Sequence, residues 1–316
     1  VFYCFSANAY PFDEGRGYLP FQVVGLLAYN GDFGALARRL SEGQQKPDRV
    51  EVRSKLDGCR VDPSKPVPRP PIALNIIDGA YMDREVRLFT LGNFSAVIGK
   101  AKSKKTFFLT MLTSAMISDA FKDKFVPRLP SGKKKVVYFD TEQGDYDVYN
   151  TGKRIAGMAG RWGGFDMYQL REFDPRERCQ MIEECLSSDP QIGFAVIDGI
   201  ADLGVANNDE EEATRITSLL MKWTKKYNLH IVNVIHQNKM NEFATGHLGS
   251  YIMKKAEIII SVTKDEGDKY ASMVNCDMSR GPDFESFRFR INDKELPELD
   301  YTPTLKSVKQ EEECPF

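Results

Sequence analysis

Short, continuous apolar runs alternate with longer segments of helical character over most of this chain. The apolar runs are NFSAVIG (93–99), KVVYFD (135–140), FAVID (194–198) and LHIVNVIH (229–236). The helices that we predict between them span Lys105 to about Phe121, Val148 to about Met158, and Asp209 to about Tyr227. Strands that are apolar throughout and separated by helices are typical of a parallel sheet covered on both faces. The pattern therefore predicts an α/β fold.

The pattern changes after Ala256, where strands follow one another without intervening helices. The runs AEIIISV (256–262), YASMVNC (270–276) and FESFRFRI (284–291) are separated by glycine and aspartate. They predict extra antiparallel strands at the end of the core. We therefore expect the α/β domain to span residues 75–295, followed by a loose, charged C-terminal tail over residues 296–316.

The first 60 residues are predicted to be a small helical N-terminal segment. The stretch GYLPFQVVGLLAYNGDFGALARRL (17–40) carries apolar residues at helical spacing and is interrupted at Asn30-Gly31, which predicts two short helices around a turn. Five prolines then fall within residues 63–71. Because proline has no backbone donor for helix or sheet, we expect residues 61–74 to be an extended linker.

Composition narrows the class of protein. Of the 316 residues, 42% are hydrophobic, which is enough for a sizeable core. The 43 basic and 45 acidic residues give a net charge of −2, which excludes a uniformly basic nucleic-acid-binding coat but not a local basic site. No apolar run approaches the roughly 20 residues of a membrane span. Six cysteines without CxxC spacing and three histidines favour reduced thiols in a cytoplasmic protein over a structural zinc site.

One segment between a predicted strand and a predicted helix is typical of a phosphate-binding loop. The pattern of such a loop is G-x-x-x-x-G-K-[ST], and the segment runs through Gly99, Lys100, Ala101, Lys102, Ser103, Lys104, Lys105 and Thr106. Backbone N–H groups at a helix N-terminus would surround phosphate, while Lys105 reaches the β- and γ-phosphates of ATP and Thr106 binds Mg²⁺. Lys104 replaces the second glycine of the pattern. On this segment alone, a solvated basic turn is the alternative.

Polar residues at the ends of the next three strands favour nucleotide binding. They are Glu142, Asp198 and Gln237. Ligands of open α/β sheets bind at the carboxyl ends of the strands. We therefore predict that Asp198 and Thr106 hold Mg²⁺ through water. Because Gly199 follows Asp198, no glutamate adjoins the magnesium aspartate, and Glu142 on the neighbouring strand is the predicted base that activates water.

With these motifs, residues 75–292 resemble the RecA-like ATPases. The likeness is strongest to the RepA- and DnaB-type hexameric replicative helicases and the RadA-type recombinases. The stretches that carry it are DTEQG (140–144), IDGIADL (197–203), IHQNK (235–239), GHLGSYIMKKAEIIISV (246–262) and CDMSRGPDFESFRFRI (276–291). Residues 1–45 resemble the trailing end of primase modules joined to such helicases, which implies a primase–helicase fusion.

The resemblance implies a mechanism and partners. Gln237 is expected to sense the γ-phosphate, with His236 beside it a packed strand-end residue, and Arg280 to enter the ATP site of a neighbouring copy in a hexameric ring. Single-stranded DNA is expected to contact loops after Glu142 and around residues 240–250, where the basic and aromatic residues are Lys239, Phe243 and His247.

Three functions remain open on the sequence. The first is an ATP-dependent DNA helicase or translocase of the RepA/DnaB type that acts in replication. The second is an ATP-binding scaffold or assembly module that hydrolyses ATP weakly or not at all, because Lys104 departs from the loop pattern. The third is a RadA-like recombination ATPase, which would form a filament from the same core.

Overall fold

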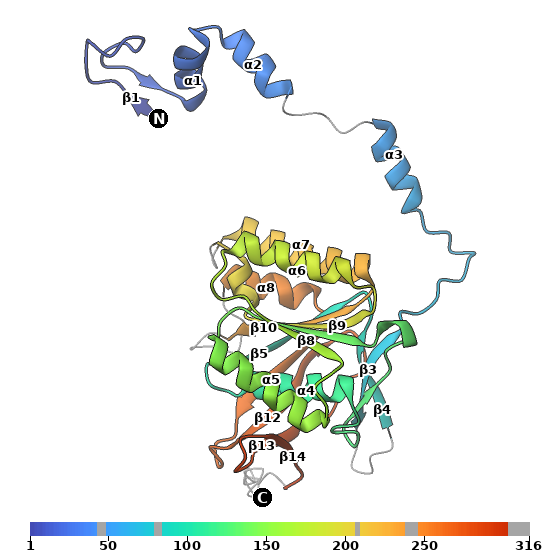
Figure 1. Cartoon of the computed structure of the whole chain (residues 1–316). Helices are drawn as coiled ribbons and strands as arrows, with labels where there is room; N and C mark the ends of the chain where they lie inside the picture. The colour runs from blue at the N-terminus through green and yellow to red at the C-terminus, as the bar shows by residue number, and fades with distance from the viewer. Residues whose placement is uncertain (43–48, 79–83, 206–208, 238–245, 303–316) are drawn as a thin grey trace, which may run out of the picture. The chain divides into compact units, whose positions relative to one another are not determined.

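A computed structural model describes most of the chain and divides it into two compact units, Val1–Pro68 and Arg69–Phe316. The described residues are 1–42, 49–78, 84–205, 209–237 and 246–302. Figure 1 shows the elements of both units. Among the described residues, no helix is long and apolar enough to cross a membrane.

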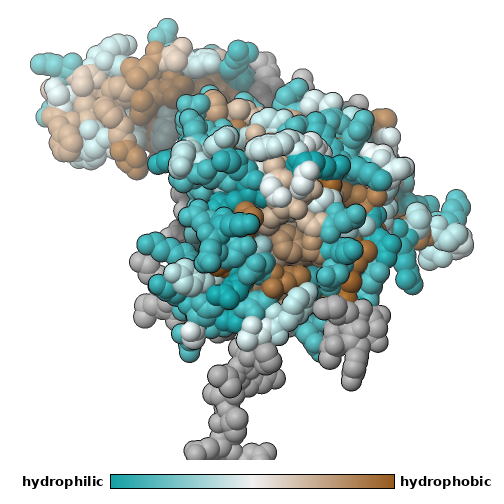
Figure 2. All heavy atoms as spheres, turned by 60° about the horizontal axis from the view of Figure 1, so that its bottom comes forward, coloured by the Kyte–Doolittle hydropathy of each residue, from teal (hydrophilic) through white to brown (hydrophobic). Residues whose placement is uncertain are grey.

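The first unit is small and mostly helical. Strands β1 (Phe2–Tyr3) and β2 (Gly17–Tyr18) pair antiparallel, and helices α1 (Pro20–Tyr29), α2 (Phe33–Glu42) and α3 (Arg49–Gly58) follow. Helices α1 and α2 are the pair that the apolar spacing predicted, and the left-handed Asn30 (φ 49°) ends α1 at the predicted turn. The buried hydrophobic residues of this unit are few, and Figure 2 shows hydrophobic residues gathered on its surface.

The second unit is built on a nine-stranded sheet in the order β14-β13-β12-β11-β5-β10-β9-β7-β8. From β11 to β8 every neighbouring pair is parallel, whereas β12, β13 and β14 are antiparallel additions. The strands are β5 (Phe94–Gly99), β7 (Lys135–Asp140), β8 (Phe165–Gln169), β9 (Ile192–Asp198), β10 (His230–His236), β11 (Ile258–Lys264), β12 (Ala271–Ser279), β13 (Phe287–Ile291) and β14 (Pro297–Asp300). The predicted fold class, a mostly parallel α/β sheet extended by C-terminal antiparallel strands, is confirmed.

Helices cover both faces of this sheet (Figure 1). Helices α4 (Lys105–Ile117) and α5 (Asp145–Ala159) lie on one face, and α6 (Pro175–Ser188), α7 (Glu210–Tyr227) and α8 (Gly246–Lys255) lie on the other. Short 3-10 helices η1 (Ser131–Lys133) and η2 (Ile200–Leu203) complete the connections. Alternate residues of β5 therefore enter different cores: Val97 packs with α4, and Ala96 and Ile98 pack on the opposite side. This explains why the central strands are apolar throughout.

A second sheet of three antiparallel strands was not predicted. Its order is β4 (Arg84–Thr90), β3 (Ile72–Asp78) and β6 (Phe125–Pro127). Strand β3 begins inside the stretch 61–74 that we expected to be linker. The last proline is Pro71, so backbone donors are available again from Ile72 onward, and the chain joins a sheet there.

The last strand, β14, lies inside the stretch 296–316 for which a loose tail was expected. Its partner β13 carries Arg288, whose guanidinium reaches three carboxylates: Asp265 (3.0 Å), Asp268 (3.3 Å) and Asp300 of β14 (2.7 Å). The Arg288 side chain is only 12% exposed. This ion-pair cluster holds β14 and the turn between β11 and β12 to β13, so the charges that suggested a loose tail fix an edge strand instead.

Replacing Arg288 with glutamine should destabilise the second unit by about 3 kcal/mol, because three partly buried carboxylates lose their cation. The measurement is urea-induced unfolding followed by circular dichroism. Arg290→Gln is the matched control: this side chain is 45% exposed, its distance to Asp268 is 3.8 Å, and its loss should cost about 0–1 kcal/mol. Equal effects of the two changes would contradict the role given to Arg288.

Candidate functional site

The predicted phosphate-binding loop connects β5 to α4 at the carboxyl edge of the parallel strands. Strand β5 ends at Gly99, α4 begins at Lys105, and the neighbouring parallel strands end at the same edge. The backbone N–H of Gln237 donates to the carbonyl of Gly99 (3.1 Å), which fixes the start of the loop beside the end of β10. The strand ends that the sequence marked by polar residues therefore do meet at one place.

Gly99 is required by space. A Cβ atom at this position would overlap the carbonyl oxygen of Val262 on β11 and the hydroxyl of Ser103. The loop therefore turns in close contact with its surroundings, and the N–H of Ser103 donates to the carbonyl of Lys100 inside the turn (3.2 Å). A larger residue at 99 would displace the whole loop.

Lys104 adopts the left-handed conformation that the usual glycine takes without strain. Its φ and ψ are 69° and 29°, which costs a residue with a Cβ about 1–2 kcal/mol. The ammonium group of Lys104 donates to the carbonyl of Ala271 (3.0 Å) and to the hydroxyl of Ser272 (3.4 Å) on β12. Burial, and then the nearby charge of Lys264, lower the pKa of Lys104. The side chain thus points away from the phosphate position and ties the loop to β12.

The ammonium group of Lys105 is buried in the hollow of the loop. It donates to the carbonyls of Gly99 (2.9 Å) and Lys100 (3.1 Å), and it lies 3.3 Å from Nδ1 of His236. Burial lowers the pKa of Lys105, while the charges of Asp198 and Glu142 oppose the shift. The cation therefore stands where the sequence expected it to meet phosphate.

Thr106 and Asp198 form the predicted magnesium pair. The Thr106 hydroxyl donates to Oδ2 of Asp198 (3.1 Å), and the hydroxyl of the fully buried Tyr138 donates to the same oxygen (2.8 Å). Burial, and then the charge of Asp140, raise the pKa of Asp198 to about 7. A hydroxyl and a carboxylate are the oxygen donors that Mg²⁺ takes beside a phosphate, so this pair fits the ion.

Glu142 lies on the other side of the same space. Its Oε1 is 3.4 Å from Nε2 of His236, and this hydrogen bond lowers the pKa of Glu142 despite its partial burial. Asp140 fixes the turn before it, since its carboxylate accepts from the backbone N–H groups of Glu142 (3.0 Å) and Gln143 (2.8 Å). Lys105, His236 and Glu142 therefore form one hydrogen-bonded line across the site.

These side chains line one cavity of about 420 Å³, which lies within the usual range for small-molecule sites. The predicted residues that line it are Lys102, Ser103, Lys104, Lys105, Thr106, Glu142 and Asp198. His236, Gln143, Asp147 and Arg154 line it too. One concave space thus holds a buried cation, a hydroxyl, and two carboxylates in different environments.

Gln237 does not line this cavity. It is 9% exposed and lines a second cavity of about 650 Å³ on the other side of the loop, together with Lys100 and Ala101. Successive residues at a strand end point to opposite sides, so only one of His236 and Gln237 can face Glu142. That residue is His236, which was expected from the sequence to be a packed strand-end residue.

Arg280 lies far from this chain's own loop. Strand β12 runs antiparallel to β11, so its Ala271 end lies beside Lys104 and its Ser279 end lies at the opposite edge of the sheet. The Arg280 guanidinium donates to the carbonyl of Lys255 (2.8 Å). Its role in the site of a neighbouring copy stays a prediction.

The expected DNA-contacting residues are only partly described. Lys239 and Phe243 lie outside the described residues. His247 is exposed at the start of α8.

Two residues of the site, Tyr138 and Asp140, were not given a role from sequence. Both lie on β7 two positions apart and therefore on one face of the strand, where Tyr138 binds Asp198 and Asp140 orders the turn of Glu142. An aromatic hydroxyl two residues before a strand-end acid was the readable signal.

A strand, a phosphate-type loop and a helix, with an aspartate ending a strand two places away and antiparallel strands beyond β11, define a RecA-like P-loop ATPase core. Among solved structures, the chain is similar to one described as the RadB recombinase (TM-score 0.46, 16% identity, 66% of this chain and 91% of that chain covered). It is also similar to the ATPase domain of a DnaB-type helicase (TM-score 0.48, 13% identity, 64% and 82% covered). No family model and no curated protein matches the chain.

The left-handed backbone at Lys104 predicts an order of stability between two variants. Lys104→Ala and Lys104→Gly both lose the hydrogen bonds to β12, but only glycine relieves the backbone strain. The glycine variant should therefore be more stable than the alanine variant by about 1–2 kcal/mol. Thermal unfolding of both variants beside the unchanged chain measures this difference, and an alanine variant as stable as the glycine variant would contradict it.

Proposed function

We propose that this chain hydrolyses ATP with Mg²⁺ and uses the reaction to move on single-stranded DNA, as a helicase or translocase of the RepA/DnaB type. The observation that carries the proposal is that Lys105, Thr106, Asp198 and Glu142 line one cavity at the N-terminus of α4. Four residues from three separate strand ends converge there in the arrangement that phosphoryl transfer to water requires.

Each residue has a distinct part in the reaction. The loop N–H groups and the N-terminus of α4 would hold the phosphates, and Lys105 would leave its carbonyl partners to neutralise them. Thr106 and Asp198 would hold Mg²⁺, which when bound neutralises charge on the β- and γ-phosphates. Glu142 would accept a proton from water as the water oxygen bonds to the γ-phosphorus and the bond to ADP breaks. A lowered pKa suits Glu142 to this task because the carboxylate stays ionised.

His236 supports the same reaction as a positioning residue. Its imidazole lies between the Lys105 ammonium and the Glu142 carboxylate, so movement of Lys105 toward phosphate would be transmitted to the base. Gln237, expected from the sequence to sense the γ-phosphate, remains a candidate for that role from its cavity on the other side of the loop.

The movement on DNA requires more than one copy of the chain. Arg280 cannot reach its own loop, so its proposed use is in trans, in a hexameric ring where it stabilises the transferring phosphoryl group of a neighbour. A primase module and replication proteins are the further partners that this proposal implies.

A scaffold module that binds ATP without turnover is the second candidate, and the observation that favours it is the strained Lys104. Nucleotide binding without turnover would support this candidate. A filament instead of a ring, seen by light scattering or negative-stain images, would favour a RadA-like recombination ATPase.

Two substitutions test the catalytic assignments. Lys105→Ala should reduce Mg-ATP turnover by about 10²–10³-fold, because it removes the buried cation at the phosphates. Glu142→Gln should reduce turnover by about 10²–10⁴-fold and leave ATP binding intact, because it removes only the base. The measurement is phosphate release with and without single-stranded DNA, on particles of known oligomeric state.

Lys225→Ala, an exposed lysine on α7, is the matched control and should retain full turnover. Unchanged turnover in both site variants, or no DNA-stimulated turnover in the unchanged chain, would overturn the proposal.

A further inference from the structure

A basic groove lies at the opposite edge of the main sheet from the candidate site. Four arginines line it, and we call it the arginine groove: Arg69, Arg84, Arg87 and Arg280. Its volume is about 640 Å³. The N–H of Arg280 donates to the carbonyl of Glu257, whose own N–H donates to Phe94 at the start of β5. The six residues of β5 therefore separate the groove from the phosphate loop, a distance of about 20 Å.

The charges of the arginine groove are not balanced by the protein. Within the described part of the chain, Arg69 and Arg84 make no ion pair or side-chain hydrogen bond. Arg280 binds a neutral carbonyl, and the nearest carboxylate to Arg87 is that of Glu257, at 4.0 Å. Several cations around one concave space repel one another, and this repulsion falls when an anion enters.

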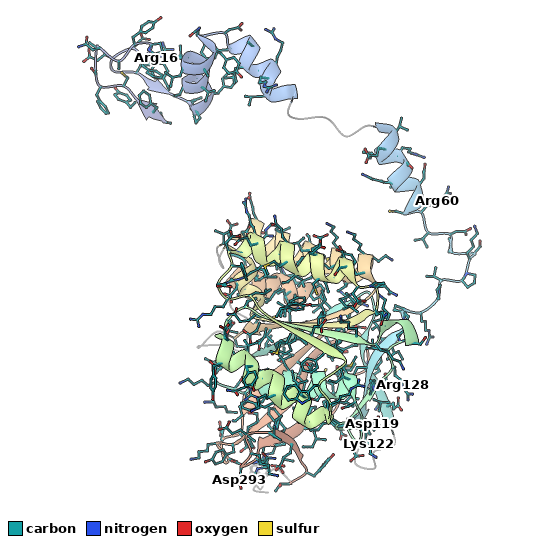
Figure 3. The ribbon with its side chains drawn as sticks, viewed as in Figure 1. Arg16, Arg60, Asp119, Lys122, Arg128 and Asp293 are labelled. Carbon is teal, nitrogen blue, oxygen red and sulfur yellow. The ribbon has the colours of Figure 1, made fainter. Side chains whose placement is uncertain are left out.

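The one acid among the described residues that line the groove, Glu85, is already engaged. Both of its carboxylate oxygens accept from the guanidinium of Arg128 (2.7 and 2.9 Å), and Figure 3 labels Arg128 beside this small sheet. This bidentate pair lowers the pKa of Glu85. Glu85 therefore stays charged but has its charge engaged by Arg128, and it leaves the four groove arginines available.

The framework under the arginines is fixed. Arg84 and Arg87 are on β4, and the buried carboxylate of Glu257 accepts from the backbone N–H (2.9 Å) and hydroxyl (2.7 Å) of Thr90 at the end of that strand. The Arg87 guanidinium occupies the space that a side chain at Gly281 would fill. The groove thus presents its cations from ordered backbone, which lowers the entropic cost of binding.

We propose that the arginine groove binds a chain of phosphates, namely the backbone of single-stranded nucleic acid, at a site separate from the ATP site. Guanidinium groups match phosphate oxygens in bidentate geometry. Four arginines from three segments of the chain exceed what one phosphate can engage. The described residues that line the groove include no aromatic side chain, so bases find no stacking partner there and binding is independent of sequence.

The test is fluorescence anisotropy of a labelled oligothymidylate with the full chain, without nucleotide, over a series of salt concentrations. In Arg69→Ala/Arg84→Ala, the affinity should fall about tenfold, and the slope of log K against log salt should fall by about 1.4, or 0.7 for each lost phosphate contact. Both residues are exposed, and thermal unfolding verifies that the variant folds.

Two comparisons make the result specific. Arg161→Ala/Arg176→Ala removes the same charge from exposed positions outside the groove and should change affinity less than twofold. Lys105→Ala should bind the oligonucleotide as the unchanged chain does, so the groove can be correct even where the proposed ATPase function fails.

A second probe, inorganic tripolyphosphate, separates the sources of the phosphates. If tripolyphosphate binds the unchanged chain but not the groove variant, and the oligonucleotide does not bind, the site is supported and its ligand is a small polyphosphate. If neither probe binds, or if the groove and control variants lose affinity equally, the proposal is overturned.

Discussion

The close packing of β5 between β10 and β11 constrains the chain at Gly99. The carbonyl of Val262 on one side and the backbone of Gln237 on the other leave no room for a side chain there. The chain must turn at once, and α4 begins six residues later with Lys105 and Thr106 in its first turn. The positions of the buried cation and the magnesium hydroxyl thus follow from a contact between three strands.

The unusual Lys104 shows how a departure from a loop pattern can be accommodated. A left-handed lysine costs about as much as one or two hydrogen bonds return. Its ammonium group makes such bonds to Ala271 and Ser272, and the Ser272 hydroxyl in turn donates to the carbonyl of Ser103 (3.2 Å). The loop is therefore cross-linked to β12 through both the strained residue and the one before it, and the phosphate side of the loop keeps its shape.

The parts of the fold that have strong periodicity could be predicted from the sequence. Strand 135–140 has its predicted bounds as β7, and the loop, Glu142 and Asp198 lie together because buried parallel strands end at one edge. The three-stranded sheet was missed because the prolines just before Ile72 and the charges of β4 conceal short strands. Helix α6 was also missed, although Asp174 and Glu177 form a capping box before it.

The choice between His236 and Gln237 could not be made from sequence. Which of two successive residues faces a cavity depends on where the strand stops relative to its neighbours, and that is a tertiary property. The trans role of Arg280 is outside one chain altogether.

The cluster around Arg288 has a consequence for how the domain opens. The N–H of Asp265, which pairs with Arg288, donates to the carbonyl of Ala271, and the same carbonyl accepts from Lys104. The phosphate loop, the turn between β11 and β12, and the last strand β14 are thus successive links of one bonded chain. Hydrogen exchange at the C-terminal edge and at the loop should therefore report a single cooperative unit, although nearly 200 residues separate them in the sequence.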